Sequence, residues 1–144
     1  RWVEDDGLLN TLDDLGIGSI AFTPLAQGLL TSKYLQGVPE ESRANQDKSL
    51  DRQKLTPELV ENLKALNELA SGRGQTLAQM ALAWVLRGER ITTALIGASS
   101  TKQVVDCAGA VERLDFTDSE LSRIDKLSGD MGINLWAKSS ETDI

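Results

Sequence analysis

Apolar and polar residues in the first part of the chain follow two different spacings. Leucines recur at helical spacing across residues 8–15, and Gly16 and Gly18 follow, which predicts a short helix that ends there. The compact apolar run "SIAFT" (19–23) lies between Gly18 and Pro24. This pattern predicts a strand covered on both faces. From Pro24 to Thr56 the sequence is polar and irregular, as in a long functional or disordered loop.

The residue pattern in the second part of the chain predicts two helices, then a strand and then two further helices. Thr56 precedes Pro57 at a helix start, and "SGRGQ" ends that helix. Its expected buried stripe is Leu59, Val60, Leu63, Leu66 and Leu69. Thr76 and Gln79 form a capping box for the helix "LAQMALAWVLRG", which is apolar nearly all round and therefore expected to be buried.

The remaining elements are predicted from the same kinds of signal. "TALIG" (93–97) is the second expected strand, and Ser100 with Gln103 predicts a capping box directly after it. Thr117 with Glu120 predicts another for the last helix. The order indicates an α/β fold with parallel strands. Because two parallel strands alone would leave edges and apolar surface uncovered, and the chain begins with Arg1, we expect a piece of something longer.

Composition and charge exclude several classes of protein. The chain has 144 residues with 40% hydrophobic and 26% charged content, which suits one globular unit. A net charge of -7 argues against a nucleic-acid partner, because such binding draws on surplus Lys and Arg. No apolar run nears the roughly 20 residues that span a bilayer, and no signal layout opens the chain. Since Cys107 is the single cysteine, no internal disulfide is expected, and we predict a cytoplasmic protein without a membrane partner.

Candidate chemistry follows each predicted strand. "GASSTKQVVDC" (97–107) places small and hydroxyl residues between a strand and a helix start, an arrangement that accepts phosphate. The alternative is that Ser99 or Ser100 only caps the helix. Pro24 and Gly28 equally suit an ordinary turn. Ligand binding is favoured because both strands end in such loops. In an α/β barrel, ligands bind at the carboxyl ends of the strands.

Four ordered motifs resemble one known family over essentially the whole chain. They are "AFTPLAQGLLTSKY", "VPEESRAN", "TLAQMALAWVLR" and "LIGASSTKQVVD", and they resemble the C-terminal part of the aldo-keto reductases. The branch with bacterial L-glyceraldehyde 3-phosphate reductases and potassium-channel beta subunits is the most similar. The resemblance implies the seventh and eighth strands of a (β/α)8 TIM barrel, with residues 1–144 as the C-terminal part of one barrel domain and the N-terminal half absent.

The resemblance also implies an NADP(H) site and a small carbonyl substrate. Phe22 matches an aromatic position against the nicotinamide, and Cys107 stands where the family usually has Asn contacting adenine, while Thr23 replaces the commoner Ser. Lys33 and Arg43, by default surface charges, match basic positions near the phosphates. The remaining cofactor positions are the loop residues Thr23, Pro24, Leu25, Ala26 and Gly28 and the adenosine-phosphate residues Gly97, Ser99, Gln103 and Asp106.

The family's catalytic residues have no counterpart in this chain. It contains no histidine, and its only tyrosine, Tyr34, is expected to be a packing residue. No metal ligands are predicted, Cys107 is expected to be an inert thiol, and Trp136 suits a pocket wall or packing equally. We therefore expect an NADPH-dependent reductase whose catalytic residues lie in the missing half, inactive as this chain alone. The alternative is a non-catalytic nucleotide-sensing module, and a homo-oligomer is left open.

Overall fold

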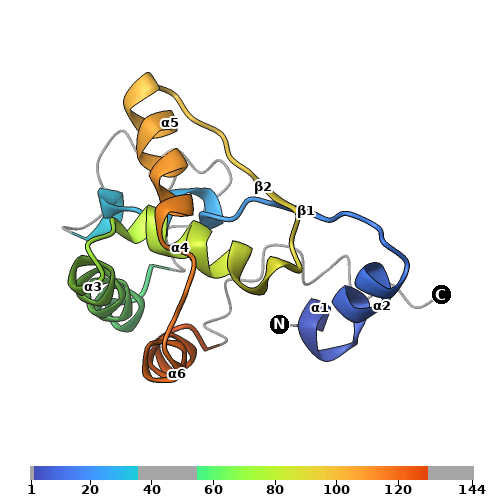
Figure 1. Ribbon diagram of the computed structural model, residues 1–144. Coiled ribbons are helices and arrows are strands. Elements are labelled where there is room, and N and C mark those ends of the chain that lie inside the picture. The colour runs from blue at the N-terminus through green and yellow to red at the C-terminus, as the bar shows by residue number, and fades with distance from the viewer. Residues whose placement is uncertain (1, 36–54, 130–144) are drawn as a thin grey trace.

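The computed structural model describes residues 2–35 and 55–129, which form helices around one small sheet (Figure 1). The two strands are β1 (Ile20–Phe22) and β2 (Thr93–Leu95). The α-helices are α1 (Trp2–Asp5), α2 (Leu8–Asp14), α3 (Pro57–Gly72), α4 (Leu77–Leu86), α5 (Thr101–Ala108) and α6 (Asp118–Leu127). Short 3-10 helices are η1 (Ala26–Gly28), η2 (Ser32–Tyr34), η4 (Arg87–Glu89) and η5 (Gly109–Glu112).

Three of the helices begin at the threonines that the sequence predicts. The Thr56 side chain accepts a hydrogen bond from the Leu59 N–H at 3.2 Å, where Pro57 opens α3. Complete capping boxes start α4 at Thr76 and α6 at Thr117. These three predictions are confirmed, because each cap depends only on residues three positions apart.

The predicted capping box at Ser100 is only half formed. Ser100 Oγ accepts from the Gln103 N–H at 3.3 Å, as expected. Gln103 Oε1, however, accepts from the N–H of Ser99 at 2.8 Å, so the reciprocal bond reaches one residue further back. Two adjacent serines offer the glutamine two backbone targets, and the loop conformation selects the first.

The sheet is parallel, as predicted, and each strand is three residues long. Ala21 lies opposite Ala94, and both are half-buried on the face where α4 contacts β2. The other face carries Ile20, Phe22 and Leu95, which are 67%, 59% and 62% exposed. The prediction that the first strand is covered on both faces is therefore wrong for the described residues. Among residues 2–35 and 55–129, helices cover the alanine face of this sheet, and the small alanine side chains suit their close approach.

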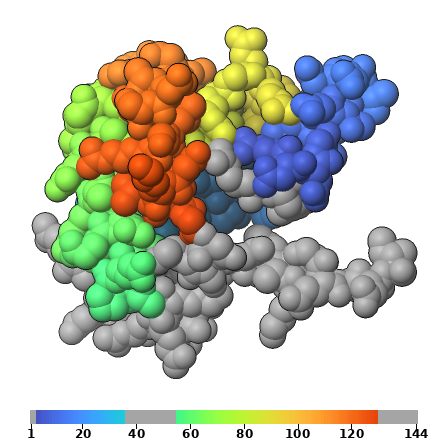
Figure 2. All heavy atoms as spheres, turned by 90° about the horizontal axis from the view of Figure 1, so that it is seen from below, coloured from blue at the N-terminus to red at the C-terminus, as the bar shows by residue number. Residues whose placement is uncertain are grey.

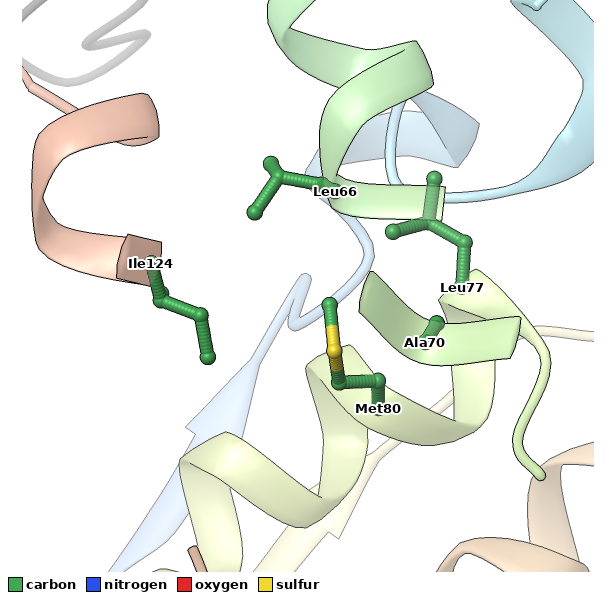
Figure 3. Packing of buried hydrophobic residues seen from close by; sticks show 5 residues of the cluster. All are labelled: Leu66, Ala70, Leu77, Met80 and Ile124. Atoms are coloured by element: carbon green, nitrogen blue, oxygen red, sulfur yellow. The ribbon is translucent and has the colours of Figure 1, made fainter. Parts of the chain in front are cut away.

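The largest apolar cluster lies where α3, α4 and α6 meet. In Figure 3 the side chains of Leu66, Met80 and Ile124 point toward one another between the three helices. Ala70 and Leu77 complete the cluster, and each is at most 1% exposed. A second cluster joins Leu29 and Tyr34 to Leu59 and Leu63 of α3. Met80 is therefore part of the core, as expected for the apolar helix that carries it, while Trp84 is half-buried against the first cluster.

One buried arginine fixes α6 to the turn between α3 and α4. Arg73 is 4% exposed, and its NH1 lies 2.7 Å from Glu120 Oε2. Its Nε donates to Gln75 Oε1 at 2.9 Å and its NH2 donates to the Asp115 carbonyl at 2.8 Å. Partial burial raises the pKa of Glu120, but the Thr117 backbone N–H and then Arg73 outweigh it and hold that pKa below its ordinary value. Sequence reasoning took "SGRGQ" only as a helix stop and missed this contact.

The N-terminal helices lie at the opposite end of the molecule from α3. In the view of Figure 2 they form the dark blue region, across the molecule from the green surface of α3, and α6 (red) lies between them. Glu4 and Arg87 form an ion pair at 2.6 Å that ties this end to the segment after α4. Within the described ranges, none of the helices combines the length and apolar character needed to cross a membrane.

Candidate functional site

The carboxyl ends of both strands lie at the same edge of the sheet. Phe22 lies opposite Leu95 in the parallel register, so the segments that follow leave the sheet together. The segment after β1 runs on toward α3 and α4, whereas the segment after β2 leads outward to the start of α5 (Figure 1). Phe22, which the resemblance predicts to lie against a ligand, is 59% exposed at this edge.

The loop after β1 is strained at residues other than glycine. Thr23, Ala26 and Gln27 have φ values of 53°, 45° and 58°, and Gly28 follows at 96°. Left-handed backbone costs a residue with a Cβ about 1–2 kcal/mol. The Ala26 N–H donates to the Thr23 carbonyl at 3.0 Å and the Gly28 N–H donates to the Leu25 carbonyl at 2.9 Å, which closes the turn. Strained backbone at three residues of one short loop is typical of functional sites.

Gln27 adds a feature that sequence reasoning missed. Its Oε1 atom is buried, and residues 2–35 and 55–129 offer it no hydrogen-bond donor. A buried acceptor without a donor is unfavourable, by roughly 1–3 kcal/mol. A donor supplied by a ligand or by further polypeptide would therefore be favourable here. The only sequence signal was a polar residue inside an otherwise small and apolar motif.

The other end of this loop is anchored to the core. Thr31 Oγ1 donates to the Gly28 carbonyl at 2.7 Å and accepts from the Lys33 N–H at 3.3 Å. Tyr34 is 1% exposed in the cluster with Leu29, which confirms its packing role. Lys33 is exposed, and its Nζ lies 5.6 Å from the centre of the Tyr34 ring. The loop thus carries an exposed cation a few residues beyond its strained turn.

The loop after β2 brings two predicted residues together. Gln103 Oε1 accepts from both the N–H and the Oγ of Ser99, at 2.8 and 3.1 Å. Gly97, Ser99 and Gln103 are all exposed. The hydroxyl and amide groups at the start of α5 therefore form one ordered polar surface. The capping alternative is also realised, but by Ser100 rather than Ser99.

Asp106 lies on α5 against the start of α4. Thr76 Oγ1 is 3.3 Å from both carboxylate oxygens of Asp106, and Gln79 Nε2 donates to the Asp106 carbonyl at 3.0 Å. Partial burial, and then the Asp106 charge, raise the pKa of the neighbouring Cys107 thiol. A raised pKa keeps the thiol protonated, which agrees with the expectation of an inert cysteine.

The structure places the described site residues in two groups. The first lies in β1 and the loop after it (residues 22–33), and the second lies in the loop after β2 and in α5 (residues 97–106). Thr23 is exposed, and Asp106 is half-buried. Arg43 and Trp136 lie outside the described residues. The described part of the chain brings no three His, Cys, Asp or Glu side chains together where they could hold a metal ion. The residues of the first group that are half-buried are Pro24, Leu25, Ala26 and Gly28.

Comparison with known proteins gives one family and several relatives. The model of the aldo/keto reductase family matches residues 1–128. The chain is 48% identical, over 98% of its length, to the L-glyceraldehyde 3-phosphate reductase of Escherichia coli strain K12, of which it covers 42%. It is 37% identical, over 78% of its length, to a putative voltage-gated potassium channel subunit beta of Schizosaccharomyces pombe, of which it covers 34%. The chain thus spans about two fifths or less of the curated relatives that it matches.

Proposed function

This chain belongs to the aldo/keto reductase family, and on that premise we propose that it is the NADP(H)-binding part of a reductase of small aldehydes or ketones. The observation that carries the proposal is the strained loop at residues 23–28, which leaves the same sheet edge as the segment leading to Ser99 and Gln103. A dinucleotide has a nicotinamide end and an adenosine end, and two loops that leave one edge of a sheet can hold one end each. The chain supplies both from successive strands of a proposed (β/α)8 barrel.

The residues of both groups fit the chemistry of this cofactor. The strained turn exposes backbone for a close approach to ribose and pyrophosphate, and the unpaired Gln27 oxygen suits a donor such as a ribose hydroxyl. Lys33, with Arg43, would neutralise phosphate charge. Ser99 and Gln103 would bind the adenosine phosphate, and this end of α5 also carries the positive end of the helix dipole. When bound, the reduced nicotinamide supplies a hydride, and the Phe22 ring would orient it.

We expect the proton that completes carbonyl reduction to come from outside this chain. The sequence has no histidine, and its only tyrosine is Tyr34. Tyr34 is 1% exposed among leucines, where no substrate carbonyl can reach its hydroxyl. We therefore place the proton donor in a first half of the barrel. The exposed apolar face of β1 and β2 fits that arrangement, because the interior of such a barrel is filled by side chains from all strands.

L-Glyceraldehyde 3-phosphate is the substrate that the comparisons favour. The relative with that printed activity is more similar, and matches more of this chain, than the potassium channel subunit. The channel subunit supports the alternative of a nucleotide-sensing interaction module. The exposed residues Ser32 and Lys33 are compatible with both functions, so turnover rather than structure distinguishes them.

Turnover by the complete polypeptide that carries this segment tests the proposal. With NADPH, it should reduce L-glyceraldehyde 3-phosphate or methylglyoxal, and the loss of NADPH absorbance measures the rate. The 144-residue chain alone, used as the control, should show no turnover because it lacks a proton donor. Tight NADPH binding without turnover of either aldehyde would favour the sensing module. Absence of NADPH binding would refute both.

A further inference from the structure

Helix α5 is attached to α4 by polar contacts rather than by burial of its own apolar residues. None of its residues is buried, and Val104 and Val105 are 49% and 66% exposed. Its contacts with α4 centre on Asp106, whose carbonyl accepts from Gln79 Nε2 at 3.0 Å. The Asp106 carboxylate faces the Thr76 hydroxyl at 3.3 Å from both oxygens. The three side chains form what we call the α4–α5 latch: Thr76, Gln79 and Asp106.

The identity of Gln79 is explained by the latch and not by helix capping. In the capping box of α4, Gln79 Oε1 accepts from the Thr76 N–H at 3.0 Å, and a carboxylate would serve this role equally. Glu120 does so in the matching box of α6, where its Oε2 accepts from the Thr117 N–H at 2.8 Å. Only an amide can also donate, and Gln79 uses its Nε2 for the Asp106 carbonyl.

Gly109 supports the same interpretation from the other side of the contact. A Cβ at this position would lie 2.7 Å from Gln79 Nε2, which is closer than real contacts allow. Its φ is ordinary for any residue, so a side chain here would be accommodated by moving the flexible end of Gln79, at the expense of its bond to the Asp106 carbonyl. The absence of a side chain at 109 therefore leaves room for the Gln79 amide beneath α5.

We propose that Gln79 and Thr76 are positioning residues that set α5 for the adenosine phosphate end of the dinucleotide. This inference rests on the proposed function. Gln103 and Asp106 are three residues apart and therefore lie on neighbouring positions of one helix face. Rotation or lifting of α5 would move both together, along with the Ser99 group that Gln103 holds. The Asp106 carboxylate keeps free lone pairs while it accepts from Thr76, so the latch and a ligand can use it at once.

The variant Gln79→Glu separates the latch from the cap. Glutamate keeps the acceptor for the Thr76 N–H, and its charge suits a helix start, so α4 should stay folded. It loses the donor to the Asp106 carbonyl and adds a negative charge beside the Asp106 carboxylate. Thr76→Ser, which keeps the hydroxyl for both the cap and the carboxylate, is the matched control and should behave as wild type.

Two measurements on the complete polypeptide test the inference. The first is amide exchange without ligand, in which Gln79→Glu should speed exchange in α5 and leave α3 unchanged. The second compares adenosine 2′,5′-bisphosphate, which resembles the adenosine end, with reduced nicotinamide mononucleotide, which resembles the other end. Loss of one hydrogen bond that positions α5 should lower the affinity for adenosine 2′,5′-bisphosphate about three- to tenfold. The affinity for reduced nicotinamide mononucleotide should stay unchanged.

The outcomes separate this inference from the proposed function. If wild type binds both ligands and Gln79→Glu weakens them equally or not at all, the positioning role is refuted. Unchanged exchange in α5 would refute the latch itself, whatever the ligands do. If wild type binds neither ligand, the proposed function fails, and α5 exchange alone then decides whether the latch holds the helix.

Discussion

Replacing Thr23 by glycine should stabilise the protein, although Thr23 lies in the proposed cofactor loop. Thr23 has φ 53°, a left-handed conformation in which a β-branched residue is strongly disfavoured. Its side chain is exposed, so glycine would lose no buried contact. The only change at this position in the absence of cofactor is therefore in backbone strain and backbone entropy.

The size of the effect follows from these two opposing contributions. Left-handed backbone costs a residue with a Cβ about 1–2 kcal/mol. Glycine loses more conformational freedom on folding, which costs roughly 0.5–1 kcal/mol. The mid-range values of these two contributions leave a net gain of about 0.75 kcal/mol in the free energy of unfolding for Thr23→Gly.

Urea unfolding of the complete polypeptide, followed by tryptophan fluorescence, measures this gain. Thr23→Ala is the matched control, because alanine removes the hydroxyl and the branch but keeps the Cβ that disfavours left-handed backbone, so it should gain less stability than glycine. NADPH affinity should fall further in Thr23→Gly than in Thr23→Ala, since only glycine loosens the loop that the cofactor needs ordered. Equal stability of the glycine and alanine variants would refute the interpretation that the loop stores strain.

Three further predictions concern other residues. Phe22→Ala should lower kcat more than it lowers NADPH affinity, because the exposed ring is proposed to orient the reacting end; a large affinity loss with unchanged kcat contradicts this. Arg43→Ala should weaken NADPH binding about ten- to a hundredfold and leave NADH nearly unaffected, with Lys33→Ala as the rival, and titration of both cofactors decides between them. Glu120→Gln should destabilise the protein at neutral pH. Since the Glu120 pKa is lowered, its contribution is present above the unfolded pKa of about 4.3 and is lost as pH falls through the folded value, so the two proteins should converge in acid unfolding experiments.

Local signals in the sequence predicted most of the helices and the strand order. Thr56, Thr76 and Thr117 start helices as expected because a cap needs only its own three following residues. The parallel pairing of β1 and β2 also agrees with the prediction. The predicted coverage of the first strand on both faces was wrong for the described residues. Burial of Ile20 and Phe22 depends on which elements pack against the sheet, and the pattern of a five-residue run cannot specify that.

The features of the site that depend on tertiary contact escaped sequence reasoning. Left-handed backbone is usually indicated by glycine or asparagine, so the residue types at positions 23 and 26, Thr23 and Ala26, did not predict it. Arginine is by default a surface residue, yet Arg73 is buried because Glu120 and the Asp115 carbonyl, more than 40 residues away in sequence, satisfy its charge. Gln79 was recognised as a cap, whereas its second bond to Asp106 requires α5 to be in place.

Mapping of amide exchange with and without NADPH tests the central claim most directly. In the complete polypeptide, saturating NADPH should slow exchange in two separate segments of this chain, residues 23–35 and 97–106, and should leave α6 unchanged. Those segments hold the strained loop, Lys33 and the Ser99–Gln103 group. Binding of NADPH that protects neither segment would contradict the account, since the cofactor would then lie elsewhere in the protein.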